Sequence, residues 1–352
     1  MDLLHSWGVE VCVHLQKSYA HWGAVFSLAS AVADLHTVYF CLFPVWFHLH
    51  RNTALRLIWT AALVDWVNLL LKWVLFGERP YWWVHESHFY GPGTAPTLQQ
   101  FPITCETGPG SPSGHAMGSS AVWYVMVTSL LSIAAQNKCS PLKYRFLQMF
   151  LWMLMVLVQL VVGMSRVYVA THFPHQMIFG VISGVLVAKV VSRFKWIYSA
   201  TLRTYLLSTL FLSSFAMGFN LLLKVWGVDL LWTLAKCQKW CTNPEWIHLD
   251  SSLFASLVRN MGTLFGLGFG LHSPLGANGG TSGGLRGGLL VLSVLLVQLL
   301  DVWTFSSENH AKFFTLLFVK SAIAMLIPTA LVPWTLSWIS PQNKKKFKSS
   351  CK

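Results

Sequence analysis

Long apolar runs recur along almost the whole of this sequence, and they constrain its fold more than any other feature. A helix needs about 20 mostly apolar residues to cross the hydrocarbon core of a bilayer. Nine windows reach a suitable length: about 23–47, 55–76, 117–135, 147–164, 174–192, 205–224, 254–272, 287–304 and 313–339. We therefore predict an all-α, polytopic membrane helix bundle of about nine transmembrane helices, with residues 1–352 as a single integral membrane domain.

The composition supports a membrane protein and argues against a nucleic-acid-binding one. The chain is 54% hydrophobic and only 11% charged, with 18 Trp and 23 Phe, which is unusual for soluble domains. Its net charge of +13 would suit nucleic acid if the basic residues formed one surface. They fall instead in short clusters between apolar runs, so we expect the lipid bilayer as a partner and no nucleic acid.

The distribution of Lys and Arg between alternate loops predicts the topology. Fifteen lie on one side, and seven on the other: Lys17, Arg79, Arg166, Lys224, Lys236, Lys239 and Lys312. By the positive-inside rule the richer side is cytosolic, so the N-terminus is lumenal and the C-terminus cytosolic. We expect a lumenal Trp-rich cap loop at 225–253, a flexible cytosolic linker at 273–288 and a cytosolic basic tail at 340–352.

Three polar motifs then fall on the same lumenal side. Lys72 and Arg79 are seven residues apart, which is two helical turns, so both can face one site. Taken alone, each could be a snorkelling or interfacial anchor. The third motif, Arg166 with His172, lies in the short turn 165–173. Because nine spans place this turn and the loop 77–116 on one face, the motifs can meet.

The middle motif opens a helix. Ser113, Gly114 and His115 precede an apolar run that begins at Met117, so they should form its first turn, where unpaired N–H groups favour an anion. Three cations, such a helix start and two histidines suit phosphoryl transfer. Arginine forks bind phosphoryl oxygens, while one imidazole attacks phosphorus and the other protonates the leaving alcohol. A lone histidine at a helix end is usually structural, but the complete set favours catalysis.

The three motifs together have a known counterpart. Lys72-x₆-Arg79-Pro80, Pro112-Ser113-Gly114-His115 and Ser165-Arg166-x₅-His172 resemble the signature of the type 2 phosphatidic acid phosphatase and vanadium haloperoxidase superfamily. This signature covers about residues 72–176, the predicted catalytic core. The flanking sequences closely resemble the glucose-6-phosphatase family, and the similarity runs nearly end to end. That family's nine-span architecture and lumenal site agree with the topology read from the loops.

The resemblance also implies roles for individual residues. His172 would be the nucleophile that forms a phosphohistidine, and His115 the proton donor. Five residues would bind the phosphoryl group: Lys72, Arg79, Ser113, Gly114 and Arg166. The superfamily commonly has Asp four residues after the nucleophile, where this chain has Gln176, which cannot stabilise an imidazolium by charge. Asp34 or Asp65 could supply the orienting carboxylate instead, and each could equally be an interhelical hydrogen-bond partner.

The sugar contacts and the remaining chemistry are less constrained. Glu106 and Asn260 are candidates to meet sugar hydroxyls, although either could be packing polarity. The 14 His residues form no metal-binding motif, so we expect neither a metal nor a cofactor. Cys237 and Cys241 could form a disulfide in an oxidising lumen, and two free thiols are equally consistent with the sequence.

The resemblance implies hydrolysis of glucose 6-phosphate at the lumenal face of the endoplasmic reticulum membrane, with a glucose-6-phosphate transporter as functional partner. One alternative is a lipid phosphate phosphatase with the same core, which would need a site open sideways to the bilayer. Another is a transporter or low-activity paralogue that only binds phosphate esters. The second alternative has no need of two histidines in nucleophile and acid positions.

Overall fold

Every regular element in the described part of the chain is helical, which confirms the all-α prediction. The computed structural model describes residues 1–91, 93–274 and 283–339. The predicted basic tail 340–352 and most of the predicted linker 273–288 lie outside these residues. The chain divides into two compact units, each made of discontinuous segments. That residues 1–352 form one integral membrane domain stays a prediction.

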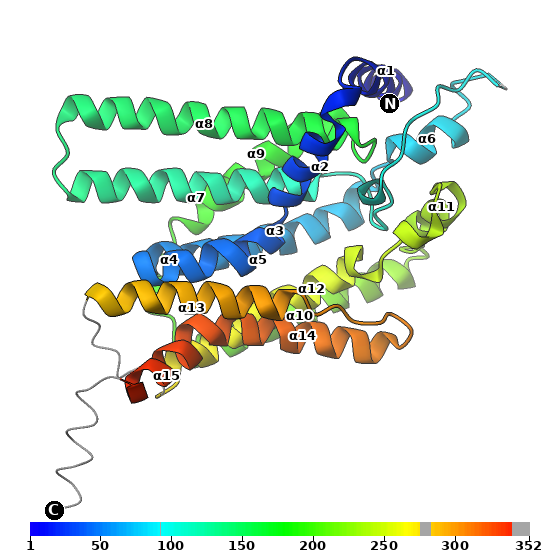
Figure 1. Cartoon of the computed structure of the whole chain (residues 1–352). Helices are drawn as coiled ribbons and strands as arrows, with labels where there is room; N and C mark the ends of the chain where they lie inside the picture. The colour runs from blue at the N-terminus through cyan, green and yellow to red at the C-terminus, as the bar shows by residue number, and fades with distance from the viewer. Residues whose placement is uncertain (92, 275–282, 340–352) are drawn as a thin grey trace, which may run out of the picture. The chain divides into compact units, whose positions relative to one another are not determined.

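The first unit comprises Met1–Leu35, Leu63–Arg193 and Ser214–Leu257. Its helices (Figure 1) are α1 (Asp2–Ser18), η1 (Ala20–Trp22), α2 (Gly23–Val32), most of α5 (Arg51–Leu75), α6 (Pro80–Glu86), η3 (Pro102–Thr104), α7 (Gly114–Gln136), α8 (Pro141–Tyr168), α9 (Pro174–Val191), the end of α10 (Leu202–Val225), α11 (Trp232–Trp240), η5 (Pro244–Trp246) and η6 (Leu249–Ser251). Helix α7 packs against both α8 and α9, and α2 packs against α8. These four helices frame the motif loops.

The second unit comprises His36–Ala62, Phe194–Ser213 and Val258–Lys352. Besides the first parts of α5 and α10, it contains α3 (Leu35–Thr37), η2 (Val38–Leu42), α4 (Phe43–Leu49), η4 (Lys195–Tyr198), α12 (Leu253–His272), α13 (Gly283–Asp301), α14 (His310–Leu326), η7 (Ile327–Leu331) and α15 (Val332–Ile339). Helix α13 packs against α4, η2 and η7. Both η2 and η7 are short π-helical turns, and the side-chain amide of Gln298 on α13 donates to the Phe40 carbonyl in η2 (3.0 Å).

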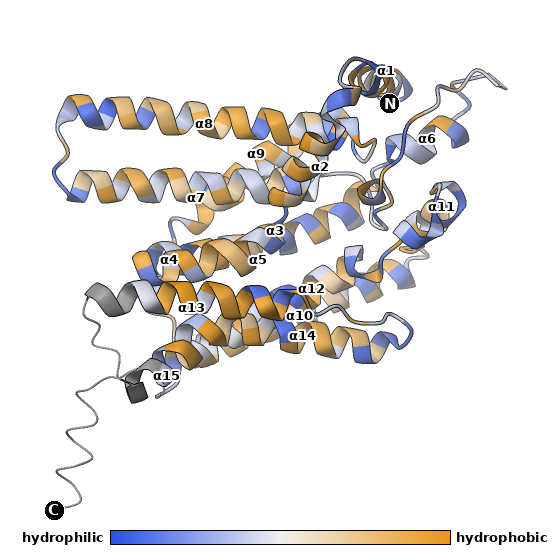
Figure 2. Cartoon of the chain, in the orientation of Figure 1, coloured by the Kyte–Doolittle hydropathy of each residue, from blue (hydrophilic) through white to orange (hydrophobic). Residues whose placement is uncertain are grey.

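The described residues include six helices that are long and apolar enough to span a membrane: Arg51–Glu86, Gly114–Gln136, Pro141–Tyr168, Pro174–Val191, Leu202–Val225 and His310–Thr335. A seventh results if the pair Ala20–Val32 and Leu35–Leu49, bent by 56°, is one span. Figure 2 shows how hydrophobic residues dominate α8, whereas α11 is largely hydrophilic. A multi-pass membrane protein is supported, and the count of nine stays a prediction.

The other two predicted spans coincide with α12 and α13. In α13 the apolar stretch Gly287–Asp301 is short. In α12 the length is sufficient, but Arg259 and Asn260 interrupt the apolar sequence. The predicted apolar windows therefore located both helices, but the length and composition of α12 and α13 do not by themselves identify them as membrane-spanning.

Helix α1 was not predicted, and it packs on the loop that carries His172. The ring of His5 stacks on Phe173, the next residue after His172, at 4.3 Å. Gln16 donates to the carbonyl of Tyr168 (2.7 Å), the last residue of α8. Helix α1 is only 17 residues long and mixes charged with apolar side chains, so the search for long apolar windows missed it.

The predicted Trp-rich loop 225–253 contains α11, which is covalently joined to the loop before the middle motif. Cys241 forms a disulfide with Cys105, across a sequence separation of 136 residues. Cys237 is buried and free. Cys241 is therefore neither bonded to Cys237 nor a free thiol, so both expectations are wrong for this residue. The sequence could not predict its partner, because a contact between residues so far apart leaves no local signal.

Candidate active site

The structure brings the three motifs of the first unit together at the ends of four helices. Lys72 lies near the end of α5, and Arg79 is the residue that precedes α6. His115 lies in the first turn of α7. Arg166 lies in the last turn of α8, where Thr171 N–H donates back to the Arg166 carbonyl (3.2 Å). This reversal, with Ala170 at a φ of 56°, places His172 beside Arg166.

A glycine contact fixes the distance between two of the motifs. On α9, Gly180 packs directly on the start of α7, where a Cβ would lie 2.8 Å from the Ser113 carbonyl oxygen. Only glycine allows so close an approach without displacing the backbone. In addition, Ser113 N–H donates to the Gln176 carbonyl (3.3 Å). The two contacts hold the His115 helix start against the helix that follows His172.

The carboxylate of Glu106 occupies the space between the motifs. Its oxygens are hydrogen-bonded to Arg166 Nη2 and lie 3.0 Å from Arg79 Nη2. They also lie 3.8 Å from His115 Nδ1 and 3.9 Å from His172 Nε2. Burial alone would raise the pKa of the Glu106 carboxyl, but Arg166 and Arg79 outweigh it and hold the pKa well below its usual range. A carboxylate anion therefore lies where both arginines and both histidines converge.

His172 is held as a neutral imidazole with one free nitrogen. Its side chain is fully buried, and Nδ1 lies 2.8 Å from the Gly110 carbonyl oxygen. A carbonyl can only accept, so Nδ1 carries the proton and Nε2 keeps its lone pair. Nε2 has no hydrogen-bond partner among the described residues. Burial and the charges of Arg79 and Arg166 hold the pKa of His172 well below its usual range, which suits a nucleophile.

The residue that orients His172 differs from the expectation. Neither Asp34 nor Asp65 takes that position, because the Gly110 carbonyl does. Asp65 accepts from the Ser256 hydroxyl, and Asp34 Oδ2 lies 3.3 Å from His115 Nε2. The sequence could not predict this acceptor, because every residue has a backbone carbonyl and nothing in the sequence distinguishes that of Gly110.

The position of the superfamily aspartate has a different task here. Gln176 donates from Nε2 to the Glu78 carbonyl (2.7 Å) and accepts from Phe173 N–H (3.1 Å). Glu78 precedes Arg79, so this amide ties the His172 loop to the Arg79 loop. Gln176 stabilises the geometry of the site and carries no charge toward the imidazole.

The two arginines differ in how many of their hydrogen-bond donors are already used within the protein. Arg79 is fully buried and donates to three backbone carbonyls, those of Gly108 (2.8 Å), Thr171 (3.2 Å) and Pro109 (3.3 Å). Arg166 donates from Nη1 to the Ser30 hydroxyl (2.8 Å). Its Nε–H is buried and unpaired within the described ranges. Arg166 therefore keeps a donor free for an anion, whereas Arg79 also holds the motif loops in place.

The other predicted phosphate-binding groups surround the same point less directly. Lys72 is buried, and its Nζ lies 3.8 Å from the position that a Cβ on Gly108 would take. The Ser113 hydroxyl caps α7 by accepting from Ala116 N–H (3.5 Å), while the Ser113 amide is bonded to Gln176. Helix geometry leaves the first-turn amides of Gly114 and His115 for a ligand. The phosphate-binding roles stay predictions.

Asn260, the second sugar candidate, lies in the other unit. Its Oδ1 accepts from the Tyr39 hydroxyl at 2.6 Å, a contact typical of polar packing between membrane helices. Its sugar role stays a prediction. Among the described residues, no group of three or more His, Cys, Asp or Glu side chains could hold a metal ion.

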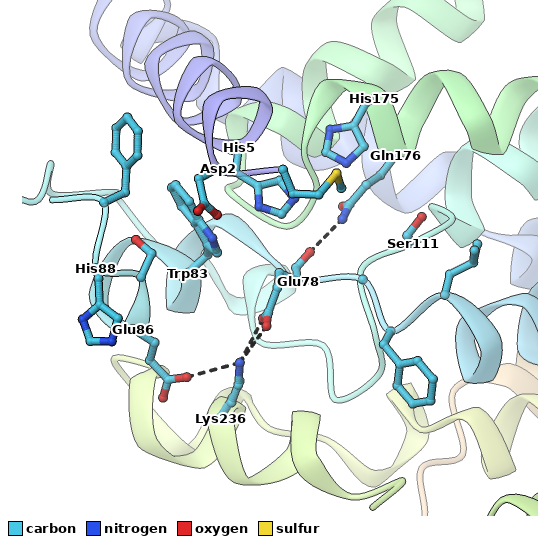
Figure 3. A pocket seen from close by; sticks show the side chains of 16 residues that line it. Asp2, His5, Glu78, Trp83, Glu86, His88, Ser111, His175, Gln176 and Lys236 are labelled. Atoms are coloured by element: carbon cyan, nitrogen blue, oxygen red, sulfur yellow. Dashed lines mark hydrogen bonds and ion pairs between the residues drawn. The ribbon is translucent and has the colours of Figure 1, made fainter. Parts of the chain in front are cut away.

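A cavity of about 1020 Å³ is lined by the start of α1, by the chain segments around Glu78 and Ser111, and by Lys236 of α11. Figure 3 shows Gln176 pointing to Glu78, and Lys236 of α11 between Glu78 and Glu86. The lining includes Ser111 and His175 but neither of the catalytic candidates, His115 and His172. The lining of this cavity therefore does not include the point where the arginines and histidines meet.

Comparison with known proteins agrees with this geometry. Residues 53–199, which contain all three motifs, match the PAP2 superfamily. The helical fold and the paired histidines and arginines therefore define a membrane protein of the PAP2 class. No solved structure matches the chain significantly.

The family within this class follows from three relatives. Glucose-6-phosphatase catalytic subunit 1 of Haplochromis nubilus is 67% identical, over 97% of this chain and 98% of the relative. The protein of that name from Canis lupus familiaris is 47% identical over 98% of both chains. Glucose-6-phosphatase 2 of Mus musculus is 45% identical over 99% of this chain and its own full length. This chain belongs to the glucose-6-phosphatase catalytic subunit family.

Proposed function

We propose that this chain hydrolyses glucose 6-phosphate to glucose and inorganic phosphate through a phosphohistidine on His172. The observation that carries the proposal is the position of the Glu106 carboxylate, bound by Arg79 and Arg166 with one oxygen facing each histidine. A phosphoryl group at that point would lie within reach of both imidazoles. In-line displacement then requires His172 and His115 to act from opposite sides of phosphorus.

In this mechanism His172 Nε2 attacks phosphorus while His115 donates its proton to O6 of the sugar, and the P–O6 bond breaks. Glucose leaves with that proton. Water then attacks phosphorus and gives a proton to His115, and the P–Nε2 bond breaks, so inorganic phosphate is released and both histidines are regenerated. Arg79, Arg166 and Lys72 stabilise the charge that develops on the non-bridging oxygens. Asp34 Oδ2 lies 3.3 Å from His115 Nε2, close enough to help hold the ring in position for the proton transfer.

The substrate is tested by comparing two phosphate esters in one preparation. Purified full-length protein in detergent should release phosphate from glucose 6-phosphate much faster than from phosphatidic acid, the substrate expected of a lipid phosphatase with the same core. Preference for phosphatidic acid would contradict the sugar phosphatase assignment. Binding of both esters without phosphate release would favour the phosphate-ester-binding alternative.

The location belongs to the proposal as well. The Lys and Arg asymmetry supports a lumenal site in the endoplasmic reticulum membrane, with a lumenal N-terminus, a cytosolic C-terminus and the Trp-rich loop 225–253 as a lumenal cap. A lumenal site needs its substrate carried across the membrane, so a glucose-6-phosphate transporter is the functional partner. A protease site engineered into 136–146 should be cleaved from the cytosol in intact microsomes, and one in 85–100 only after permeabilisation. Equal cleavage of both would contradict this topology.

A further inference from the structure

The anion-binding point of this site already holds an anion of the chain itself. Glu106 lies between Arg79 and Arg166 and faces both histidines. In the proposed mechanism the phosphoryl group must occupy the same point. Two anions cannot share one pair of guanidinium groups at contact distance, because like charges a few ångströms apart repel strongly in a poorly solvated site. Binding of the phosphoryl group therefore requires the carboxylate to leave.

The backbone on both sides of Glu106 is fastened, so the side chain has to make this movement. Cys105 is joined by its disulfide to Cys241 at the end of α11. On the other side, the Thr107 carbonyl accepts from the Thr233 hydroxyl of α11 (2.8 Å). The Glu106 amide itself donates to the Thr104 carbonyl (2.9 Å). With both neighbours tied to α11, rotation about the side-chain bonds is the movement left to the carboxylate.

Both the carboxylate and the phosphoryl group can neutralise the buried arginines, so one anion can replace the other. Without substrate, the carboxylate neutralises part of the charge of Arg79 and Arg166, both fully buried, and burying such cations without a counter-ion is costly. With substrate, a phosphoryl dianion offers more charge and more acceptor oxygens than a carboxylate does. After hydrolysis the same comparison applies to inorganic phosphate, which the returning carboxylate helps to expel.

We propose that Glu106 is an internal counter-anion that exchanges with the phosphoryl group and thereby sets the affinity of the site for phosphate. The proposal rests on the proposed function, since it assigns the phosphoryl group to this point. It gives Glu106 a different task from the sugar contact predicted from sequence. A sugar contact would strengthen ligand binding, whereas an internal competitor weakens it.

The two tasks give opposite results when the carboxylate charge is removed. The probe is inorganic phosphate, measured by its inhibition constant against glucose 6-phosphate hydrolysis and by the rise in melting temperature that it causes in full-length protein. If the carboxylate occupies the site nine-tenths of the time, the apparent affinity is reduced about tenfold. Glu106→Gln should therefore bind phosphate at least about tenfold more tightly. Its melting temperature without phosphate should be lower, because two buried arginines lose their counter-ion.

Two further variants make the result specific. Glu106→Asp withdraws the carboxylate by one methylene from Arg166 and should tighten phosphate binding in the same direction, by less. The Glu106→Asp variant also tests the proposal if Glu106→Gln fails to fold. Glu10→Gln removes an exposed carboxylate of α1 and should leave both the melting temperature and phosphate affinity unchanged.

The outcomes separate this inference from the proposed function. Unchanged or weaker phosphate binding by Glu106→Gln and Glu106→Asp, in a protein whose wild type hydrolyses glucose 6-phosphate, would overturn the counter-anion and leave the function intact. An equal gain in phosphate affinity in Glu10→Gln would show that the gain depends only on net charge, and it would also overturn the counter-anion role of Glu106. Failure of the wild type to hydrolyse glucose 6-phosphate would instead contradict the proposed function. In that case tighter binding of phosphate itself, measured by melting temperature, would still support the exchange.

Discussion

Replacing His172 with alanine should abolish both glucose 6-phosphate hydrolysis and covalent labelling of the protein by ³²P substrate. The loss in turnover should reach roughly four orders of magnitude or more, as expected when a nucleophile is removed. The physical reason is that His172 Nε2 is the buried, unprotonated nitrogen that faces the anion point. Rapid-quench labelling followed by peptide mapping would locate the acid-labile, base-stable phosphohistidine.

His115→Ala provides the matched comparison, because it removes the acid and leaves the nucleophile. An aryl phosphate with a leaving group of low pKa needs no proton donor, so His115→Ala should still react slowly with it while losing glucose 6-phosphate hydrolysis. His172→Ala should lose both reactions. Label on His115, or label that persists in His172→Ala, would show that the two roles are reversed or wrong.

Arg79→Lys should lower kcat/KM by about 10²–10³-fold, the effect of losing one preorganised donor to the transition state, on the order of 2–4 kcal/mol. Lysine keeps the charge but loses the fork, and it cannot reach the three backbone carbonyls that Arg79 binds together with Glu106. The melting temperature should therefore fall as well, because these carbonyls are left without their donor.

The control for this change is Arg145→Lys at the exposed start of α8, which should alter neither kcat/KM nor stability. Steady-state kinetics and thermal unfolding of correctly inserted protein measure both effects. Near-normal kinetics in Arg79→Lys would contradict a role for Arg79 in stabilising the transition state and would leave it as a residue that only holds the motif loops in place.

The sequence predicted well those features that depend on periodicity and residue type. Apolar windows located the long helices, and the spacing of Lys72, Arg79, Arg166 and the two histidines anticipated their convergence. Such residues carry a signal because few other side chains can supply a buried cation or a neutral nucleophile. The expected helix start at Ser113 is also where α7 begins, with Ser113 as its cap.

The features that the sequence did not predict are contacts between distant or chemically ordinary groups. The Gly110 carbonyl that orients His172 is a backbone atom, and Ser30, which binds Arg166, is a common residue in an apolar helix. Glu106 was singled out as a polar group that could meet sugar hydroxyls, but nothing local in the sequence showed that it pairs with both arginines. Helix α1 lacked the long apolar run on which the search for spans relied.

The disulfide between Cys105 and Cys241 also has a topological consequence. Two cysteines can be oxidised to one bond only from the same aqueous compartment, so the chain between them must cross the bilayer an even number of times. Four long apolar helices, α7, α8, α9 and α10, lie between them, and four satisfies this parity. In the proposed topology, a variant that loses one of these helices would place the two cysteines in different compartments, one of them reducing, and could not form this bond. In that topology, formation of this bond depends on insertion of all four helices.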